Sequence, residues 1–340
     1  MALPHSILIF ANADNTGPLT MRTLVTGSNG FVGRRLCNTL ATKGYLVRGA
    51  IRSRSESVDE IELTTIGDIS KNTDWTLALS NVSNVIHLAA RVHVMSEQST
   101  DPLQAFRYVN VDATLNLAHQ AAAMGVKRFI FVSSIKVNGE STLPGQTFSA
   151  DRQPVPEDAY GVSKYEAEQA LLSIGRKTGM EVVIIRPPLV YGPGVKANFA
   201  SMMQWLARGW PLPLGAVNQN RRSLVALDNL VDLIITCIDH PAAANQIFLV
   251  SDGEDLSSAE LLTRMAKALG KPARLFFVPI PILKLGAILL NKRSIFQRLC
   301  GSLQVDIEKT RQLLGWNPPI TIDEGLRRAA QSEDKHETRV

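Results

Sequence analysis

The sequence is poor in cysteine, in clustered histidines and in long apolar runs. Its three cysteines, Cys37, Cys237 and Cys300, stand far apart without a C-x-x-C pair, which favours a reducing, cytoplasmic compartment over a disulfide framework. Six histidines form no H-E-x-x-H motif and no Cys/His cluster, so we expect no metal site. No segment interleaves basic and aromatic residues as a nucleic-acid module does, so we expect no nucleic-acid partner.

Two apolar stretches were considered as targeting or membrane segments. Residues 1–20 hold only a short apolar patch, without the basic start and longer apolar core of a signal peptide, and we expect a poorly packed extension with no chemical role. Residues 280–290 are interrupted by a proline and a lysine and are too short to span a bilayer. We interpret them as an amphipathic helix of a smaller lobe, with attachment to a membrane surface as the alternative.

What the chain does contain is a regular alternation of strands and helices. Its 340 residues are 45% hydrophobic and 20% charged, enough for a large core. The alternation over residues 21–190 predicts an α/β fold, a Rossmann-type doubly wound parallel sheet. It is lost over 191–330, where we expect a smaller mixed α/β C-terminal lobe that could return strands or helices to the first domain, followed by a tail at 331–340. The expected strands are 24–26, 47–51, 62–67, 84–88, 128–133, 181–185 and 246–250, and the expected helices include 34–43, 103–124, 160–178, 198–208, 228–239, 258–269, 307–314 and 323–330.

A glycine-rich turn follows the first expected strand. Gly27 permits a tight turn, Gly30 lets the backbone approach a pyrophosphate, and Gly33 lets the next helix lie close to the strand. The spacing has two residues between successive glycines, unlike the commoner G-x-G-x-x-G. Because a strand precedes the turn and a helix follows it, we predict a dinucleotide site that also includes Asn29, Phe31 and Val32.

The end of the second strand bears on the choice of cofactor. An acidic residue there would hold the ribose hydroxyls of NAD, but Arg52 follows the strand and can pair with a 2′-phosphate, so NADP(H) is favoured and NAD(H) remains possible. Asp68 and Ile69, after the third strand, could reach the adenine, although Asp68 could also cap a helix. The small residues that close the fourth strand leave room for a cofactor. They are Leu88, Ala89 and Ala90.

Tyr160 and Lys164 are four residues apart and share one face of an expected helix. A nearby ammonium stabilises a phenolate, so we expect Lys164 to lower the pKa of Tyr160 towards neutrality, as a general acid or base for a hydroxyl or carbonyl requires. Such pairs are also frequent on helix surfaces. The fifth strand delivers Ser134 to the same edge of the sheet.

In combination, these motifs resemble the extended short-chain dehydrogenase/reductases that act on nucleotide sugars. The glycine turn, Leu88 to Ala90, Ser134, Tyr160 with Lys164, and Arg186-Pro187 occur in the order of that family, and the resemblance covers about residues 21–326. Segments 133–139, 186–199 and 211–215 are similar to the UDP-galactose 4-epimerase relatives, especially reductases of UDP-4-keto-6-deoxy-N-acetylhexosamines in surface-polysaccharide synthesis.

The resemblance implies roles for individual residues. Tyr160 would exchange a proton with the sugar oxygen at C4, Lys164 would also hold the nicotinamide ribose, and Ser134 would bond the same sugar oxygen. Asn110 would arrange the helix or a proton-relay water, and Pro187 would line the cofactor. The residues expected to meet the UDP-sugar are Ser134, Asn198, Phe199, Arg222 and, more weakly, Arg298. Lys136 departs from the family, since many epimerases carry Thr there, and its charge either faces the substrate sugar or extends to solvent. A homodimer is a further expectation from the family.

Three functions remain open at this point. The basic end of the second strand favours net reduction, which needs exchange of NADPH for NADP, so a C4-keto reductase or dehydrogenase of a UDP-N-acetyl-6-deoxyhexosamine is the leading hypothesis. A C4 epimerase of UDP-hexoses or UDP-N-acetylhexosamines would use the same Ser, Tyr and Lys. A non-catalytic NADP(H)-sensing regulator is the distant third, and the intact catalytic set argues against it.

Overall fold

The computed structural model describes residues 22–53, 61–92 and 101–337, without the side chains of residues 197, 294 and 332–337. The predicted extension at 1–20 lies outside these residues. A seven-stranded sheet in the order β3-β2-β1-β4-β5-β6-β9 forms the larger part, and all of its strand pairs are parallel. This confirms the predicted doubly wound α/β fold. Its strands are β1 (Arg22–Thr26), β2 (Leu46–Ile51), β3 (Glu62–Thr65), β4 (Val82–His87), β5 (Arg128–Val132), β6 (Glu181–Arg186) and β9 (Ile247–Leu249).

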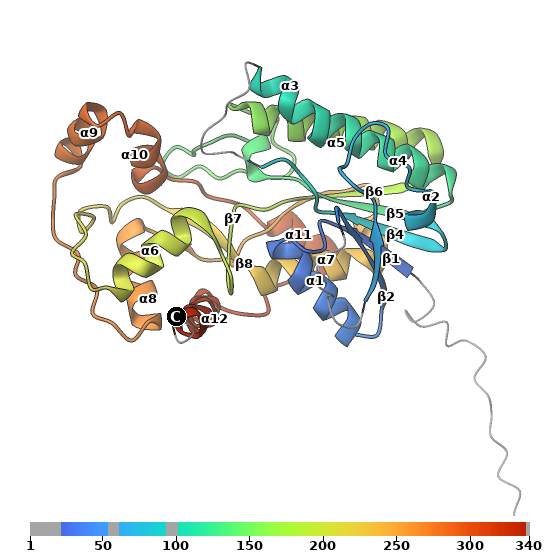
Figure 1. Ribbon diagram of the computed structural model, residues 1–340. Helices are drawn as coiled ribbons and strands as arrows, with labels where there is room; N and C mark the ends of the chain where they lie inside the picture. Colours follow the sequence, from blue (N-terminus) through green and yellow to red (C-terminus); the bar gives the residue numbers. More distant parts are fainter. Residues whose placement is uncertain (1–21, 54–60, 93–100, 338–340) are drawn as a thin grey trace, which may run out of the picture.

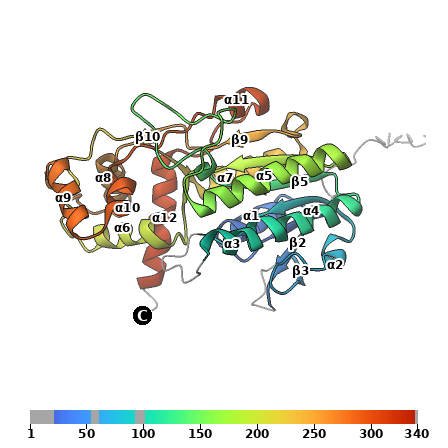
Figure 2. The same ribbon diagram turned by 90° about the horizontal axis from the view of Figure 1, so that it is seen from above.

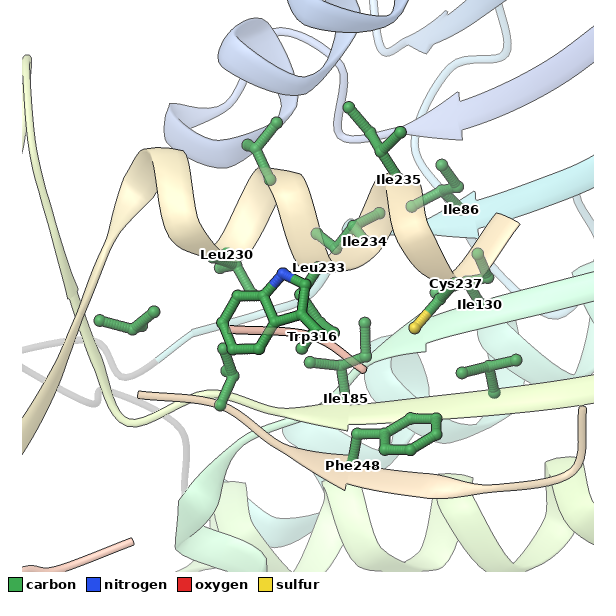
Figure 3. Close-up of a cluster of buried hydrophobic side chains, with 14 of the residues drawn as sticks. Ile86, Ile130, Ile185, Leu230, Leu233, Ile234, Ile235, Cys237, Phe248 and Trp316 are labelled. Atoms are coloured by element: carbon green, nitrogen blue, oxygen red, sulfur yellow. The ribbon is translucent and has the colours of Figure 1, made fainter. Parts of the chain in front are cut away.

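Helices cover both faces of this sheet, as Figures 1 and 2 show. One face packs against α2 (Thr76–Leu79), α4 (Thr114–Ala123) and α5 (Ala159–Thr178), and the other against α1 (Phe31–Thr42) and α7 (Leu227–Asp239). The central strands are buried on both faces, which explains why they read as continuous apolar runs. Figure 3 shows α7 laid on the sheet, with Leu230 and Ile234 of the helix facing four neighbouring strands, which contribute Ile86, Ile130, Ile185 and Phe248.

The order of the strands places the candidate site. The chain runs outwards from β1 to β3, then returns to the other side of β1 and continues through β4, β5 and β6. The direction therefore reverses between β1 and β4. In doubly wound sheets a ligand binds outside the carboxyl ends of the strands at such a reversal. Gly27 follows β1 and Leu88 follows β4, so both predicted cofactor segments lie at this point.

The expected helix at 103–124 is interrupted by a turn of π-helix. The structure has α3 (Pro102–Arg107), the π-helix Tyr108–Ala113 and then α4. A π-helical turn inside an α-helix frequently marks a functional site. Asn110, one of the predicted site residues, lies within this turn.

The smaller lobe contains a second sheet that the sequence analysis did not predict. Its strands β10 (Asp255–Leu256), β8 (Arg222–Ala226) and β7 (Leu189–Tyr191) are only two to five residues long, too short for a clear periodic signal. Helices α6 (Ala197–Ala207), α8 (Ser258–Ala268) and α12 (Ile322–Glu337) enclose a separate apolar core with this sheet. The tail predicted at 331–340 was wrong as far as Glu337, because α12 continues through it.

The chain passes between the two lobes more than once. After β8 and α7 it returns to the large sheet as β9, next to β6, and α11 (Glu308–Leu314) contacts β9. These returns lie within residues that the sequence had assigned to the second lobe.

Helices α9 (Ile280–Leu289) and α10 (Arg293–Cys300) lie at the end of the smaller lobe away from the large sheet (Figures 1 and 2). The amphipathic helix expected at 280–290 forms, but no residue of α9 is buried, so the expected buried face is absent. Among the described residues, no helix is both long enough and apolar enough to cross a membrane.

Candidate active site

The glycine turn forms a tight cradle between β1 and α1. Gly27 has a φ of 65°, and a side chain there would meet the backbone of Ala89 at 3.0 Å. A Cβ on Gly33 would lie 2.8 Å from Ser28 Cα and closer still to the Gly27 carbonyl oxygen. The first turn of α1 receives no side-chain cap and holds no acidic residue. These features fit a dinucleotide pyrophosphate at the start of α1. Asn29 is exposed beside them, and Phe31 and Val32 are half-buried against the core.

A buried hydrogen-bond bridge fixes the two strands at this point. Thr26 Oγ1 accepts from the backbone N–H groups of Leu88 and Ala89, each at 3.2 Å, and bonds His87 Nδ1 at 2.7 Å. The other ring nitrogen of His87 bonds Thr114 at 2.9 Å. Burial, followed by the charge of Lys164, lowers the pKa of His87 to about 3, so the ring is neutral at physiological pH. The bridge holds Leu88 to Ala90 where the cofactor prediction places them.

The predicted cofactor-selecting arginine is paired with the predicted adenine-facing carboxylate. Arg52 and Asp68 form an exposed ion pair at 3.0 Å. Because Asp68 competes for the guanidinium, the preference for a 2′-phosphate that Arg52 alone indicated is weakened. Ile69, next to Asp68, packs partly against the core. The second arginine of that segment, Arg54, lies outside the described residues.

The predicted proton-transfer residues lie together. The hydroxyl of Ser134 lies close enough to the phenol of Tyr160 to act on its pKa, and the Tyr160 ring meets the edge of Phe106 with centroids 5.9 Å apart. Ser134 also caps the short helix at Ile135–Val137 by accepting from Lys136 N. Pro187 is buried, and its carbonyl accepts from Ile135 N at 3.0 Å, which ties the end of β6 to this segment.

The expected lowering of the Tyr160 pKa is wrong for this arrangement of the side chains. Burial, and then the charge of Asp158, raises the pKa of Tyr160 to about 12, although the Ser134 hydrogen bond acts in the opposite direction. The phenol is therefore protonated at neutral pH and able to donate a proton. Acting as a base would require a further stabilisation of the phenolate.

Lys164 is almost completely buried, one helical turn beyond Tyr160. Its ammonium donates to the Val132 carbonyl at 2.8 Å and lies 4.0 Å from the centroid of the Phe131 ring. Burial lowers the pKa of Lys164 to about 7, and Glu168, one turn further along α5, opposes that shift. At neutral pH the charged and neutral forms of Lys164 are therefore close in free energy, and an additional hydrogen-bond acceptor nearby would favour the charged form.

Asn110 joins the segment after β4 to helix α5 through its side-chain hydrogen bonds. Its side-chain oxygen accepts from Arg91 N at 2.8 Å, and its amide donates to Arg91 O and to Ser163 Oγ, each at 3.0 Å. Ser163 in turn donates to the Tyr160 carbonyl at 2.8 Å. Of the two roles that the resemblance implied for Asn110, this geometry favours arranging the helix over ordering a relay water.

Lys136 is held by two carboxylates. Its ammonium lies 2.6 Å from Glu140 and 2.5 Å from Asp158, and a second oxygen of Asp158 caps α5 by accepting from Gly161 N at 2.6 Å. The charge that was predicted to face the substrate sugar is therefore neutralised within the protein. Direct substrate contact by Lys136 stays a prediction.

The predicted diphosphate residues divide into two groups. Arg222 is half-buried and donates to the Gly301 carbonyl at 3.0 Å; burial lowers its pKa, Glu140 opposes this, and Arg298 on α10 adds to the lowering. Two neighbouring guanidinium groups that destabilise each other favour an anion beside them. Asn198 is exposed in the first turn of α6. The ring of Phe199 is buried and stacks on Tyr191 with centroids 5.3 Å apart, and a contact of Phe199 with the substrate stays a prediction.

Several residues of the site were missed in the sequence. Asp158 stands two residues before Tyr160 and is the N-cap of α5, where its side chain accepts from Gly161 N. The sequence could have indicated this role, because Asp is a preferred residue directly before the first turn of a helix. His87 and Glu168 are single residues inside a strand and a helix. Only the fold brings His87 to Lys164, whereas Glu168 lies four residues beyond Lys164 on α5, a spacing that the sequence already shows.

Comparisons with known proteins agree with this geometry. Residues 23–251 match the model of the NAD dependent epimerase/dehydratase family. A UDP-glucose 4-epimerase of Vibrio cholerae is 53% identical over 310 residues, which cover 91% of this chain and 94% of that protein. An Escherichia coli O157:H7 protein named as an N-acetyl-alpha-D-glucosaminyl-diphospho-ditrans,octacis-undecaprenol 4-epimerase is 28% identical, with 92% of this chain and 95% of that protein covered.

Solved structures share the fold over nearly the whole chain. A UDP-glucuronic acid 4-epimerase from Bacillus cereus in complex with NAD superposes with a TM-score of 0.74 at 21% identity, covering 93% of this chain and 97% of that one. A UDP-glucose 4-epimerase from Thermotoga maritima with UDP-glucose gives a TM-score of 0.72 at 22% identity, covering 93% and 100%.

Proposed function

Because this chain belongs to the NAD dependent epimerase/dehydratase family, we propose that it is a 4-epimerase of a UDP-hexose or UDP-N-acetylhexosamine. The observation that carries the proposal is the placement of Ser134 close enough to the phenol of Tyr160 to lower its pKa, in a chain 53% identical to a UDP-glucose 4-epimerase. Epimerisation thus replaces reduction as the leading function.

The protein's own residues would manage the proton and the position of the sugar. Tyr160 exchanges the proton of the C4 oxygen, and Ser134 holds the same oxygen through a second hydrogen bond. Lys164 supplies the positive charge that the phenolate needs when Tyr160 acts as base. Arg222 and Arg298 bind the diphosphate, which anchors the sugar at one end. The role of Asn110 and Ser163 is to hold the backbone of Tyr160 in place.

We propose NAD(H) as the cofactor, held by the Gly27 to Gly33 cradle, Leu88 to Ala90 and the Lys164 face of α5. When bound there, the dinucleotide would supply the hydride chemistry at C4, with the hydride removed from one face of that carbon and returned to the other. The pairing of Arg52 with Asp68 supports NAD over NADP, because the arginine is already matched by a carboxylate. A solved relative of the same fold is described as a complex with NAD.

Reduction of a UDP-4-ketosugar is the second candidate, because the same Ser, Tyr and Lys would serve it. Net reduction needs stoichiometric NAD(P)H, whereas epimerisation regenerates its cofactor in each cycle. A regulator without catalysis has no support from the proton-transfer set or from the named relatives.

The deciding experiment incubates the purified protein with UDP-glucose and, separately, UDP-N-acetylglucosamine, with catalytic NAD. We expect NMR to detect the C4 epimer with no net change in nicotinamide absorbance. Consumption of NADPH or NADH by UDP-4-ketosugars, with no epimer formed from either sugar, would replace the epimerase proposal by the reductase.

A further inference from the structure

Helix α9 is apolar apart from Lys284, yet none of its residues is buried. Leu283, Gly286 and Ala287 are half-buried on the side that packs towards α10. The opposite side carries Ile282, Leu285 and Leu289, whose exposed fractions are 59%, 57% and 76%. A helix that is apolar all round is normally enclosed by protein or by lipid. Nothing in the described part of the chain encloses this side of α9.

The exposed apolar surface extends to both ends of the helix. Phe276 and Phe277 precede α9, Leu290 follows it, and Ile295 lies on α10, all of them exposed. We call these four residues together with Ile282, Leu285 and Leu289 the α9 patch. Large exposed apolar side chains gathered in one segment mark a place of interaction.

The electrostatics of the surrounding segment identify the partner. Residues 271–305 contain six Lys or Arg residues and no Asp or Glu. The net charge of this segment is therefore more positive than the net charge of the whole chain, which is +5. Within the described residues no member of the segment forms an ion pair, whereas the arginines of the large lobe are widely paired, as Arg48, Arg107 and Arg128 are with glutamates. The cations flanking the α9 patch, such as Lys284, Lys292 and Arg293, are therefore available to an external anion.

We propose that α9 and α10 dock this protein on an anionic phospholipid surface. The α9 patch enters the interface between headgroups and acyl chains, while Lys284, Lys292 and Arg293 contact the lipid phosphates. Ten helical residues span about 15 Å, which suits insertion into one leaflet and excludes crossing the bilayer. Self-association through the same patch is disfavoured, since it would bring two cationic segments together.

Docking there would set the orientation of the site. Arg298 lies on α10 and acts electrostatically on Arg222, so the proposed diphosphate site adjoins the docking helices. The sugar diphosphate would then be handled close to the membrane surface. The docking itself does not depend on which sugar reaction the protein catalyses.

The test is co-sedimentation of the full chain with phosphatidylcholine vesicles, with and without phosphatidylglycerol. We expect binding only to the anionic vesicles, weakened by salt, and at least tenfold weaker for L289E and for K292Q/R293Q. L77E is the matched control, since Leu77 is 80% exposed on α2 of the large lobe and should bind as the wild type does.

Absence of vesicle binding, or equal loss in L77E and L289E, would overturn the proposal. The proposal would also be overturned if wild-type protein did not bind vesicles but formed a dimer in sedimentation equilibrium, and L289E were monomeric. The α9 patch would then be the interface between two copies of this chain. Turnover of a soluble UDP-sugar should be the same in L289E and wild type, which separates failure of docking from failure of the proposed function and from misfolding.

Discussion

Asp158 binds Lys136 through one carboxylate oxygen at 2.5 Å and caps helix α5 through the other at 2.6 Å. This single side chain therefore starts the helix that carries Tyr160 and adds a negative charge near the phenol. A negative charge disfavours the phenolate, and the ammonium of Lys136 partly cancels it. The pair offers a way to shift the pKa of Tyr160 in either direction without touching the phenol.

Replacing Asp158 by asparagine should move the pH profile of catalysis. Asparagine is also a good N-cap, so α5 is retained while the charge is removed. Since Asp158 raises the pKa of Tyr160, its neutralisation lowers that pKa, and the limb of kcat/KM that rises with pH should move to lower pH. K136M leaves Asp158 unpaired and should move the same limb to higher pH. Shifts of both variants in one direction would contradict this account.

Replacing Tyr160 by phenylalanine should remove the proton-transfer group and little else. The ring keeps its contact with Phe106, whereas the hydroxyl group that Ser134 acts on is lost. We expect kcat to fall by about 10²- to 10⁴-fold with dinucleotide affinity within a factor of about three of wild type, as checked by steady-state kinetics and by calorimetric titration. Turnover that survives in Y160F would assign the proton transfer to another group.

The large sheet and the Ser, Tyr and Lys set were predictable because their signals are local. Strands buried on both faces are continuous apolar runs, and a glycine turn between a strand and a helix has a fixed spacing. The pKa of Tyr160 was not predictable, since it depends on burial and on Asp158. The pairing of Arg52 with Asp68, sixteen residues further along the chain, likewise exists only when β2 and β3 lie side by side.

Glu168 and Arg186 form a fully buried ion pair, and Arg186 also donates to Asn138 at 3.0 Å. Removing one partner leaves an uncompensated charge in the core. We therefore expect E168Q to lower the free energy of unfolding by about 3–5 kcal/mol, as measured by urea denaturation. The double variant E168Q/R186M should recover part of this loss, because no buried charge remains. If the double variant lost more free energy of unfolding than the two single variants together, the buried ion pair would not be the source of the stability lost in E168Q.

The ion pair between Arg52 and Asp68 predicts a cofactor switch. D68N frees the guanidinium for a 2′-phosphate, so the affinity for NADP relative to NAD should rise. Both side chains are exposed, and exposed pairs contribute about 0–1 kcal/mol, so the gain should not exceed about fivefold. R52A/D68N should abolish the gain. Fluorescence titration with both dinucleotides measures it, and an unchanged ratio in D68N would mean that Arg52 does not meet the ribose.

Gly33 and Gly286 provide a matched pair of glycine-to-alanine substitutions in helices. A methyl group on Gly33 would lie 2.8 Å from Ser28 Cα and press on the Gly27 carbonyl, so α1 must move away from the turn. We expect G33A to destabilise the protein by about 1–3 kcal/mol and to weaken dinucleotide binding at least tenfold. Gly286 in α9 has no atom within 4 Å of such a methyl group, so G286A should be neutral or stabilise α9 by up to about 1 kcal/mol. Thermal unfolding and dinucleotide titration of both variants test whether close contact between α1 and the turn forms the cofactor site. Equal behaviour of G33A and G286A would contradict it.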